Sequence, residues 1–336
     1  MTCTSVVTEW KQILRLNFTN WKKLADFLEL DEVQRKEIIE RPRFVLNLPL
    51  RLAQKIEKGT LEDPILKQFL PTKEETVQAN GFFTDPVGDH ACRRGSKLLQ
   101  KYNGRVLLVC TSACAMHCRY CFRQNFDYDV EDKSFAQEIE CIKNDSSIKE
   151  VILSGGDPLS LSETLLEKLL MNISAIPHIK RIRFHSRFPI GVPERIDTGF
   201  LDIIEKIPQQ IWFIIHSNHP RELDEEILLR MHELQKRKVI VGNQAVLLKG
   251  VNNDVDTLQE LCETLVDNGI IPYYLHQLDR VKGAAHFEVS EKEGTRLIEK
   301  LIARLPGYAV PKYVREIAGE PGKTPLSATS MPIKML

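Results

Sequence analysis

The stretch CTSACAMHCRYCFRQNFDY, residues 110–128, places three cysteines in one short loop with the spacing C-x3-C-x2-C. Thiolates this close together, at Cys114, Cys118 and Cys121, suit an iron–sulfur cluster or zinc. A tetrahedral zinc site needs a fourth ligand, for which His117 lies within the run. A four-iron cluster held by three cysteines keeps one iron without a protein ligand, so that iron can bind a small molecule. The spacing favours the cluster over zinc.

Outward from this loop, short β-branched runs alternate with stretches of helical periodicity. The expected strands are 105–111, 150–155, 181–186, 211–217, 238–247 and 271–278. The expected helices lie near 133–143, 161–175, 194–206, 222–236, 254–268 and 290–304. Strands that alternate with helices predict a parallel sheet with right-handed crossovers. We therefore expect an α/β fold, a partial (β/α)6 TIM-like barrel with an N-terminal helical extension.

Glycine and polar residues follow the ends of the expected strands. Besides the cysteine loop, they are Gly155-Gly156-Asp157, His185-Ser186-Arg187, His216 and Asn218, Asn243 and Gln244, and Asp279. Each of these taken singly is more simply a tight turn or a side chain that satisfies backbone groups. The chemistry of a parallel barrel gathers at the carboxyl ends of its strands. Six placements on one rim favour a shared active-site mouth.

Composition and charge exclude several classes of protein. Lysine plus arginine equals aspartate plus glutamate at 46 each, so no basic field indicates a nucleic-acid partner. No apolar run reaches membrane-spanning length, and the first residues, MTCTSVVTEWKQ, lack the apolar segment of a signal peptide. Eight cysteines without an export signal favour a reducing compartment, so we expect a cytoplasmic protein.

The ends of the chain differ from its middle. Residues 1–98 are expected to form a helical extension and a polar connection, residues 99–305 the barrel core, and residues 306–336 a C-terminal segment. In that segment Lys323 lies in a Gly/Pro-rich loop, within YVREIAGEPGKTPL. A lysine in such a loop is usually a solvated surface residue. Enzymes that use pyridoxal phosphate (PLP), however, anchor it on a lysine, and adjacent glycines allow close approach of a cofactor.

The cysteine spacing followed by Phe122 resembles the radical S-adenosylmethionine (SAM) superfamily. Over about residues 60–330, the chain resembles the lysine 2,3-aminomutases, radical SAM enzymes that also carry PLP. The matching segments are DPVGDHA, GRVLLVCTSACAMHCRYCFR, SGGDPL, SNHPRE, GNQAVLLKGVN and GEPGKTPL. LDRVKGAAHF and VREIAGEPGKTPL resemble the bacterial subgroup that supplies (R)-β-lysine for modification of elongation factor P.

The resemblance implies a role for each matching residue. The three cysteines would hold a [4Fe-4S] cluster whose open iron binds SAM. SAM would also be contacted by Gly155, Gly156, Asp157, His216 and Gln244, with the Asp157 carboxylate accepting from the SAM amine. Lys323 would anchor PLP, and its phosphate would lie on Arg105 and Tyr102. The substrate carboxylate would bind Arg123, and its distal ammonium would face Asp279 and Glu316.

The implied activity is the conversion of L-α-lysine to (R)-β-lysine. It would draw electrons from a one-electron reductant such as flavodoxin and serve elongation factor P together with its β-lysine ligase. Two departures stand out. Glu316 replaces an aspartate of the stand-alone enzymes, which predicts a weaker or differently shaped distal-amine site and leaves Arg315 or Lys312 as alternative partners of Glu316. Because no cysteine follows Cys262, we expect no structural zinc. The alternatives are a radical SAM enzyme without PLP and a metal-stabilised binding module.

Overall fold

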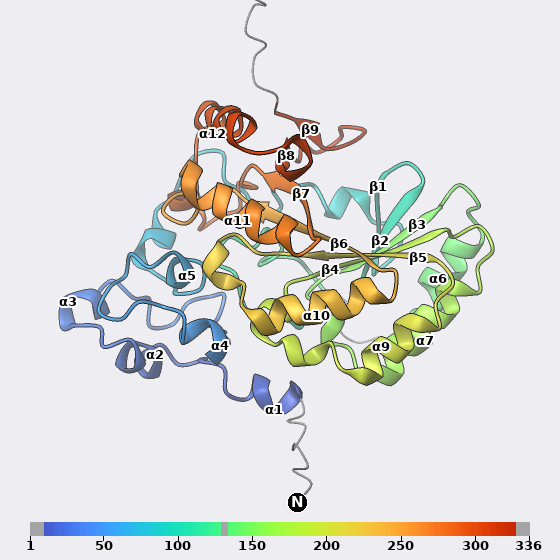
Figure 1. The fold of residues 1–336 in the computed structure, drawn as a ribbon, viewed down its shortest axis with the longest axis horizontal. Coiled ribbons are helices and arrows are strands. Elements are labelled where there is room, and N and C mark those ends of the chain that lie inside the picture. The colour runs from blue at the N-terminus through green and yellow to red at the C-terminus, as the bar shows by residue number, and fades with distance from the viewer. Residues whose placement is uncertain (1–9, 129–133, 327–336) are drawn as a thin grey trace, which may run out of the picture.

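The computed structural model describes residues 10–128 and 134–326, and within them nine strands form one sheet whose order follows the chain. The strands are β1 (Leu98–Tyr102), β2 (Arg105–Val109), β3 (Glu150–Ser154), β4 (Arg181–Ser186), β5 (Gln210–Ile215), β6 (Ile240–Val246), β7 (Ile271–His276), β8 (Lys312–Arg315) and β9 (Thr324–Pro325). Strands β2 to β8 run parallel, while β1 and β9 pair antiparallel at the edges. The sheet does not close, so the expected partial α/β barrel is confirmed (Figure 1).

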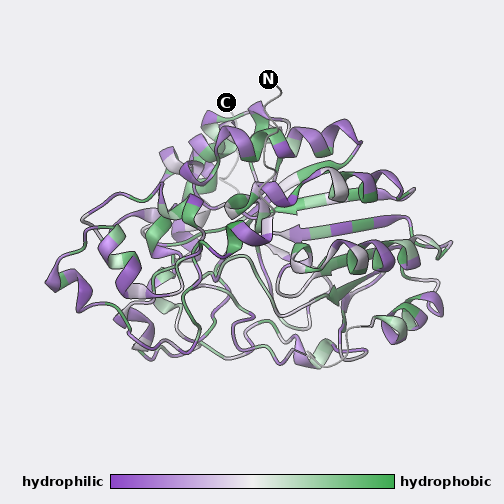
Figure 2. Ribbon diagram, turned by 90° about the horizontal axis from the view of Figure 1, so that it is seen from below, coloured by the Kyte–Doolittle hydropathy of each residue, from purple (hydrophilic) through white to green (hydrophobic). Residues whose placement is uncertain are grey.

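Helices carry the chain back between the parallel strands. They are α6 (Ala136–Lys143), α7 (Glu163–Ser174), α9 (Thr198–Glu205), α10 (Glu225–Lys236), α11 (Val255–Asp267) and α12 (Glu291–Arg304), with a short α8 (Phe188–Gly191) after β4. Five of the longer helices begin after a side chain that accepts a backbone N–H of the first turn: Ser162, Asp197, Asp224, Asp254 and Ser290. Figure 2 shows hydrophobic and hydrophilic residues alternating along these helices, as amphipathic cover requires.

The C-terminal segment extends the sheet beyond the six expected strands. Strand β8 pairs parallel with β7 from Tyr274↔Lys312 to His276↔Val314, and β9 returns antiparallel along β8. With four residues, β8 is too short for its alternation to be read from sequence. Its pairing sets Lys323, just before β9, at the end of the sheet. Residues 1–9 and 327–336, at the two ends of the expected segments, lie outside the described residues, as does residue 133, where the first expected helix begins.

The N-terminal extension consists of short helices joined by irregular chain. These are α1 (Trp10–Leu14), α2 (Trp21–Phe27), α3 (Glu32–Arg35), α4 (Leu50–Ala53) and α5 (Pro64–Lys67). They gather on one side of the sheet beside α10 and α11 (Figure 1). Their apolar residues, including Leu24, Leu52 and Ile65, join the same core cluster as the strands. None of the helices in the described ranges is long and apolar enough to cross a membrane.

Candidate active site

The glycine turn after β3 supports the cysteine loop. Gly156 N–H donates to Thr111 O at 2.6 Å, and Asp157 N–H donates to Ala113 O at 2.8 Å. A Cβ on Gly156 would lie 2.3 Å from Ala113 O, and Gly155 has φ +117°. Both glycines are therefore required by the close approach of two chain segments. Their expected contact with SAM stays a prediction.

The Asp157 carboxylate is used inside the protein. It accepts from Ser186 Oγ at 2.9 Å, from Arg187 N–H at 2.8 Å and from Phe188 N–H at 3.0 Å, and its other oxygen also accepts from Leu159 N–H. Burial raises the pKa of Asp157 to about 6 against the opposing effect of these bonds. The carboxylate thus ties the loop after β3 to the loop after β4, and its expected role as acceptor for the SAM amine stays a prediction.

The N-terminal extension holds the backbone of the cysteine loop from the other side. Asn47 Nδ2 donates to Cys114 O at 3.3 Å, and Asn17 Nδ2 donates to Ala115 O at 2.8 Å. Arg119 N–H donates to Gln68 O at 2.9 Å. Sequence reasoning missed these side chains, because a single Asn or Gln among short helices carries no pattern that marks a contact with a distant loop.

His117 is engaged with the extension as well. Its ring stacks on Phe44 with centroids 4.7 Å apart, and its Nδ1 is 2.9 Å from Val45 O. Among the described residues, His, Cys, Asp and Glu form no group of three arranged around a single metal ion. Cys114, Cys118 and Cys121 are half-buried and unpaired by disulfides. The contact with Val45 O occupies His117 Nδ1 and leaves only Nε2 free to bind a metal.

A buried polar network surrounds Cys118. Arg187 Nη1 donates to Cys118 Sγ at 2.8 Å and also to Tyr120 OH, while Arg187 Nη2 donates to Glu222 Oε2 at 2.8 Å. Gln68, the residue that ends α5, accepts from Arg187 Nη2 at 2.8 Å. The sequence predicts Arg187 only as part of the active-site rim. Its contact with Cys118 is seen only in the folded structure.

His216 and Gln244 lie on neighbouring strand ends. His216 Nε2 is 3.1 Å from Tyr120 OH, and burial, aided by the charge of Arg187, lowers the pKa of His216 to about 3, so its ring is neutral. Gln244 follows a break in the register between β6 and β7. Before that break, Asn243 bonds both backbone groups of Ser217. A bulge of this kind re-aims the next side chain.

The expected PLP lysine meets two other predicted residues. Lys323 Nζ lies 2.8 Å from Glu316 Oε2, and Tyr102 OH lies 2.7 Å from both oxygens of the same carboxylate. The Arg105 guanidinium stacks 4.6 Å from the Tyr102 ring centroid. Burial acts to raise the pKa of Glu316, but the charge of Lys323 and the bonds from Lys323 and Tyr102 outweigh it, so the pKa lies below its usual value.

Asp89 connects the Arg123 side chain to this cluster. The buried Asp89 carboxylate forms ion pairs with Arg123 Nε and with Lys101 Nζ, each at 2.8 Å. Lys101 Nζ also lies 3.5 Å from the Glu316 carboxylate. Charges therefore alternate from Arg123 to Lys323. Asp89 lies in the matching segment DPVGDHA, but no sequence pattern assigns it a role, because its two partners lie in different segments of the chain.

Asp279 faces the same group of charges. Burial raises the pKa of Asp279 to about 6 against the pull of Lys323, with Glu316 adding to the rise. His185 lies near Lys323 and Arg123; burial, together with nearby cations, holds its pKa well below the usual value. Its buried Nε2 has no hydrogen-bond partner among the described residues. Cations, an orphaned ring nitrogen and a lysine together fit an anionic aromatic cofactor such as PLP.

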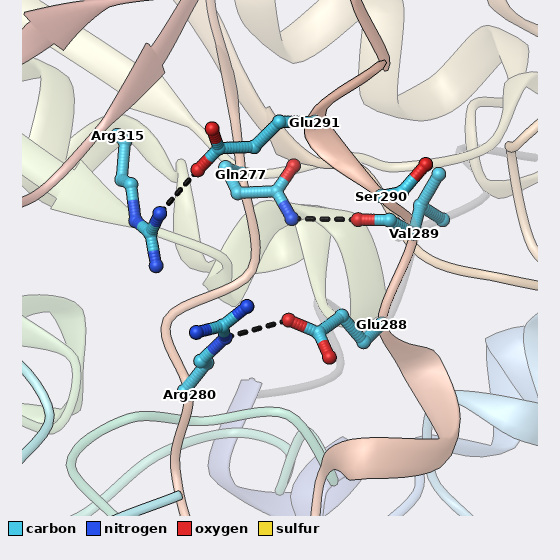
Figure 3. Close-up of a pocket in the computed structure, with 7 residues that line it drawn as sticks. All are labelled: Gln277, Arg280, Glu288, Val289, Ser290, Glu291 and Arg315. Carbon is cyan, nitrogen blue, oxygen red and sulfur yellow. Dashed lines mark hydrogen bonds and ion pairs between the residues drawn. The ribbon is translucent and has the colours of Figure 1, made fainter. Parts of the chain in front are cut away.

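A cavity of about 470 Å³ lies beside this region, between the chain after β7 and the start of α12. Its polar groups are already engaged: Arg280 with Glu288, Arg315 with Glu291, and Gln277 with Val289 O (Figure 3). Arg315 is thereby excluded as the partner of Glu316 in this arrangement. The cavity is separate from the group around Lys323.

Comparison with known proteins shows which family the chain belongs to. Residues 102–186, which include all three loop cysteines, match the family model described as a 4Fe-4S single cluster domain. The chain is 40% identical to the L-lysine 2,3-aminomutase of Haemophilus influenzae over 94% of both chains, and 42% identical to that of Escherichia coli over 84% of this chain and 83% of that protein. A radical SAM methyltransferase from Sphaerobacter thermophilus superposes with a TM-score of 0.47 at 17% identity, covering 65% of this chain and 68% of that one. The sequence identities show that the chain belongs to the lysine 2,3-aminomutase family of radical SAM enzymes.

Proposed function

We propose that this protein is a PLP-dependent radical SAM lysine 2,3-aminomutase that converts L-α-lysine to (R)-β-lysine. Family membership supports the reaction class, since the relatives are named for this activity. The observation that carries the proposal is the charge cluster around Lys323, in which the Glu316 carboxylate contacts both Lys323 and Tyr102. Lys101 and Asp89 link this cluster to Arg123.

The chain's own residues would bind both ends of the substrate. Arg123, immediately after the cysteine loop, offers a buried guanidinium suited to a carboxylate. Asp279 and Glu316 offer carboxylates to the distal ammonium. Asp89 and the cysteine loop fix the position of Arg123, so the distance between the two ends selects the length of the amino acid.

The cofactors would occupy two neighbouring parts of the rim. Lys323, Arg105 and Tyr102 would hold PLP, while Cys114, Cys118 and Cys121 would hold the cluster that binds SAM, with His216 and Gln244 near it. When bound, PLP supplies electron delocalisation and SAM supplies radical chemistry. The protein must exclude water and stray C–H bonds from such a site, and the N-terminal extension, packed on the cysteine loop, is suited to that task.

The physiological setting forms part of the proposal. β-Lysine made here would pass to a ligase that modifies elongation factor P, and the electron would come from a reductant such as flavodoxin. We place the protein in the cytoplasm, where a cluster with three cysteines stays reduced and assembled. The segments LDRVKGAAHF and VREIAGEPGKTPL support this assignment through the subgroup they resemble.

One anaerobic assay tests the proposal. Protein with reconstituted cluster is incubated with SAM, PLP, a reductant and L-lysine, and the product is separated after chiral derivatisation. Formation of (R)-β-lysine that depends on both SAM and PLP is expected. SAM cleavage without any need for PLP would favour a radical SAM enzyme of another substrate class. Absence of iron, sulfide and SAM cleavage would favour a binding module.

A further inference from the structure

Arg187 is a charged side chain in a buried position, where the loss of its hydration is unfavourable. It is 8% exposed and its ion-pair partner Glu222 is fully buried. A buried ion pair seldom adds net stability over well-packed apolar residues, because both charges lose their hydration. Stability alone therefore does not explain why a buried arginine lies beside a cysteine of the loop.

The hydrogen bonds of Arg187 hold its guanidinium toward the sulfur of Cys118. One nitrogen, Nη1, points to Cys118 Sγ at 2.8 Å, while the other, Nη2, is fixed by Glu222 Oε2 and Gln68 Oε1, each at 2.8 Å. The planar guanidinium cannot turn away from the sulfur without breaking both bonds. Gln68 is itself held by Glu222 Oε1, 3.0 Å from Gln68 Nε2.

We propose that Arg187 sets the reduction potential of the iron–sulfur cluster through a charge-assisted hydrogen bond to Cys118. The reduced cluster carries one more negative charge than the oxidised cluster. A cation that donates to a ligand sulfur stabilises the reduced form more and raises the potential. This makes reduction easier, which is the step before any SAM chemistry.

The network also gives the N-terminal extension a part in electron transfer. Gln68 ends α5 of the extension, whereas Arg187 follows β4 and Glu222 ends the 3-10 turn Pro220–Glu222 after β5. The charge at the sulfur is therefore set by three separate segments. The inference rests on cluster ligation by Cys118, which belongs to the proposed function, and does not depend on lysine as the substrate.

The test is a potentiometric titration of the reconstituted cluster without SAM, followed by visible absorbance and electron paramagnetic resonance. The double variant Arg187→Gln/Glu222→Gln keeps the net charge and removes the cation from the sulfur. Its midpoint potential is expected to be more negative than that of the wild type. Arg187→Lys, which keeps the charge, is expected to shift the midpoint in the same direction but less.

Arg221→Gln serves as the matched control. Arg221 pairs with the buried Asp63 at 2.8 Å, joining the same α5 and the same 3-10 turn without contacting a cysteine. Its midpoint should equal that of the wild type.

An intact cluster with an unchanged midpoint in the double variant would overturn the inference, as would an equal shift in Arg221→Gln. If the double variant does not fold, an unchanged midpoint in Arg187→Lys overturns it. A wild-type protein that assembles no cluster would instead overturn the proposed function.

Discussion

At the residue scale, the Glu316 side chain connects two residues of the predicted PLP site. Its carboxylate contacts Tyr102 OH and Lys323 Nζ at once. The sequence suggested a weaker distal-amine site, with Arg315 or Lys312 as rival partners of Glu316. In the structure Arg315 is paired with Glu291 instead. One carboxylate therefore holds the lysine and the tyrosine together.

Lys323→Ala tests the PLP anchor. We expect the variant to lose borohydride-fixed PLP and β-lysine formation while it keeps the cluster, because the cysteines and Lys323 lie in separate segments. The measurement is the peptide mass after reduction, together with iron content. The exposed Lys312, on the neighbouring β8, gives the control Lys312→Ala, which should retain fixed PLP. Wild-type turnover in Lys323→Ala would show that another lysine is the anchor.

The raised pKa of Asp279 predicts a pH dependence specific to lysine. The carboxylate attracts an ammonium only when ionised, so kcat/KM for lysine should fall as the pH drops through about 6. Norleucine lacks the distal amine and should not share this loss. Asp157, whose pKa also lies at about 6, touches neither end of the proposed substrate and would affect both compounds alike.

Asp279→Asn should abolish the difference in pH dependence between lysine and norleucine. It should lower the preference for lysine over norleucine by about 5- to 150-fold, corresponding to about 1–3 kcal/mol for a lost partner of a buried charged group. The ratio of the two kcat/KM values is measured from pH 5 to 8. A ratio that stays constant with pH in the wild type and is unchanged in Asp279→Asn would mean that Asp279 does not recognise the amine.

At the scale of single elements, the turn after β3 shapes the cysteine loop. Gly156→Ala would drive a Cβ to 2.3 Å from Ala113 O, so the two segments must separate. We expect a loss of about 1–3 kcal/mol of stability and a lower iron content per protein. Thermal unfolding of the apo-protein and iron analysis measure both.

Gly307→Ala is the control for that substitution. Among the described residues, and apart from Gly307 and its chain neighbours, no atom lies within 4 Å of a Cβ added at Gly307. The change should therefore leave both the unfolding midpoint and the iron content near those of the wild type. Equal iron content in Gly156→Ala and Gly307→Ala would show that the loop tolerates the displacement.

At the scale of the whole molecule, Gln68 joins the extension to the barrel. Gln68→Leu removes an acceptor for Arg187 Nη2 and for Asn218 Nδ2, both buried. Each nitrogen keeps one other partner, Glu222 Oε2 or Tyr120 OH, and each N–H that loses its acceptor costs about 1–3 kcal/mol. We expect a lower unfolding midpoint and faster loss of cluster absorbance in air. The same substitution at the exposed Gln54, also in the extension, should change neither.

The sequence alone determined the family and the fold class. Three cysteines at fixed spacing predict a ligand set within one loop, and a strand–helix alternation repeats locally, so both patterns can be read without knowing the fold. All six expected strands form, because their β-branched runs bury on both faces of a parallel sheet. The shared rim of polar residues could also be predicted, because parallel strands place their carboxyl ends on one side of the sheet.

Only the tertiary structure decided which polar residues meet. Gln68, Asp89 and Arg187 contact side chains that lie 12 to 154 residues away in the sequence, and no local pattern encodes such contacts. It likewise showed that Asp157 and both glycines serve the protein's own loops. Polar contacts of this kind are fixed by burial: once the chain packs, each buried donor must find whichever acceptor the fold brings near.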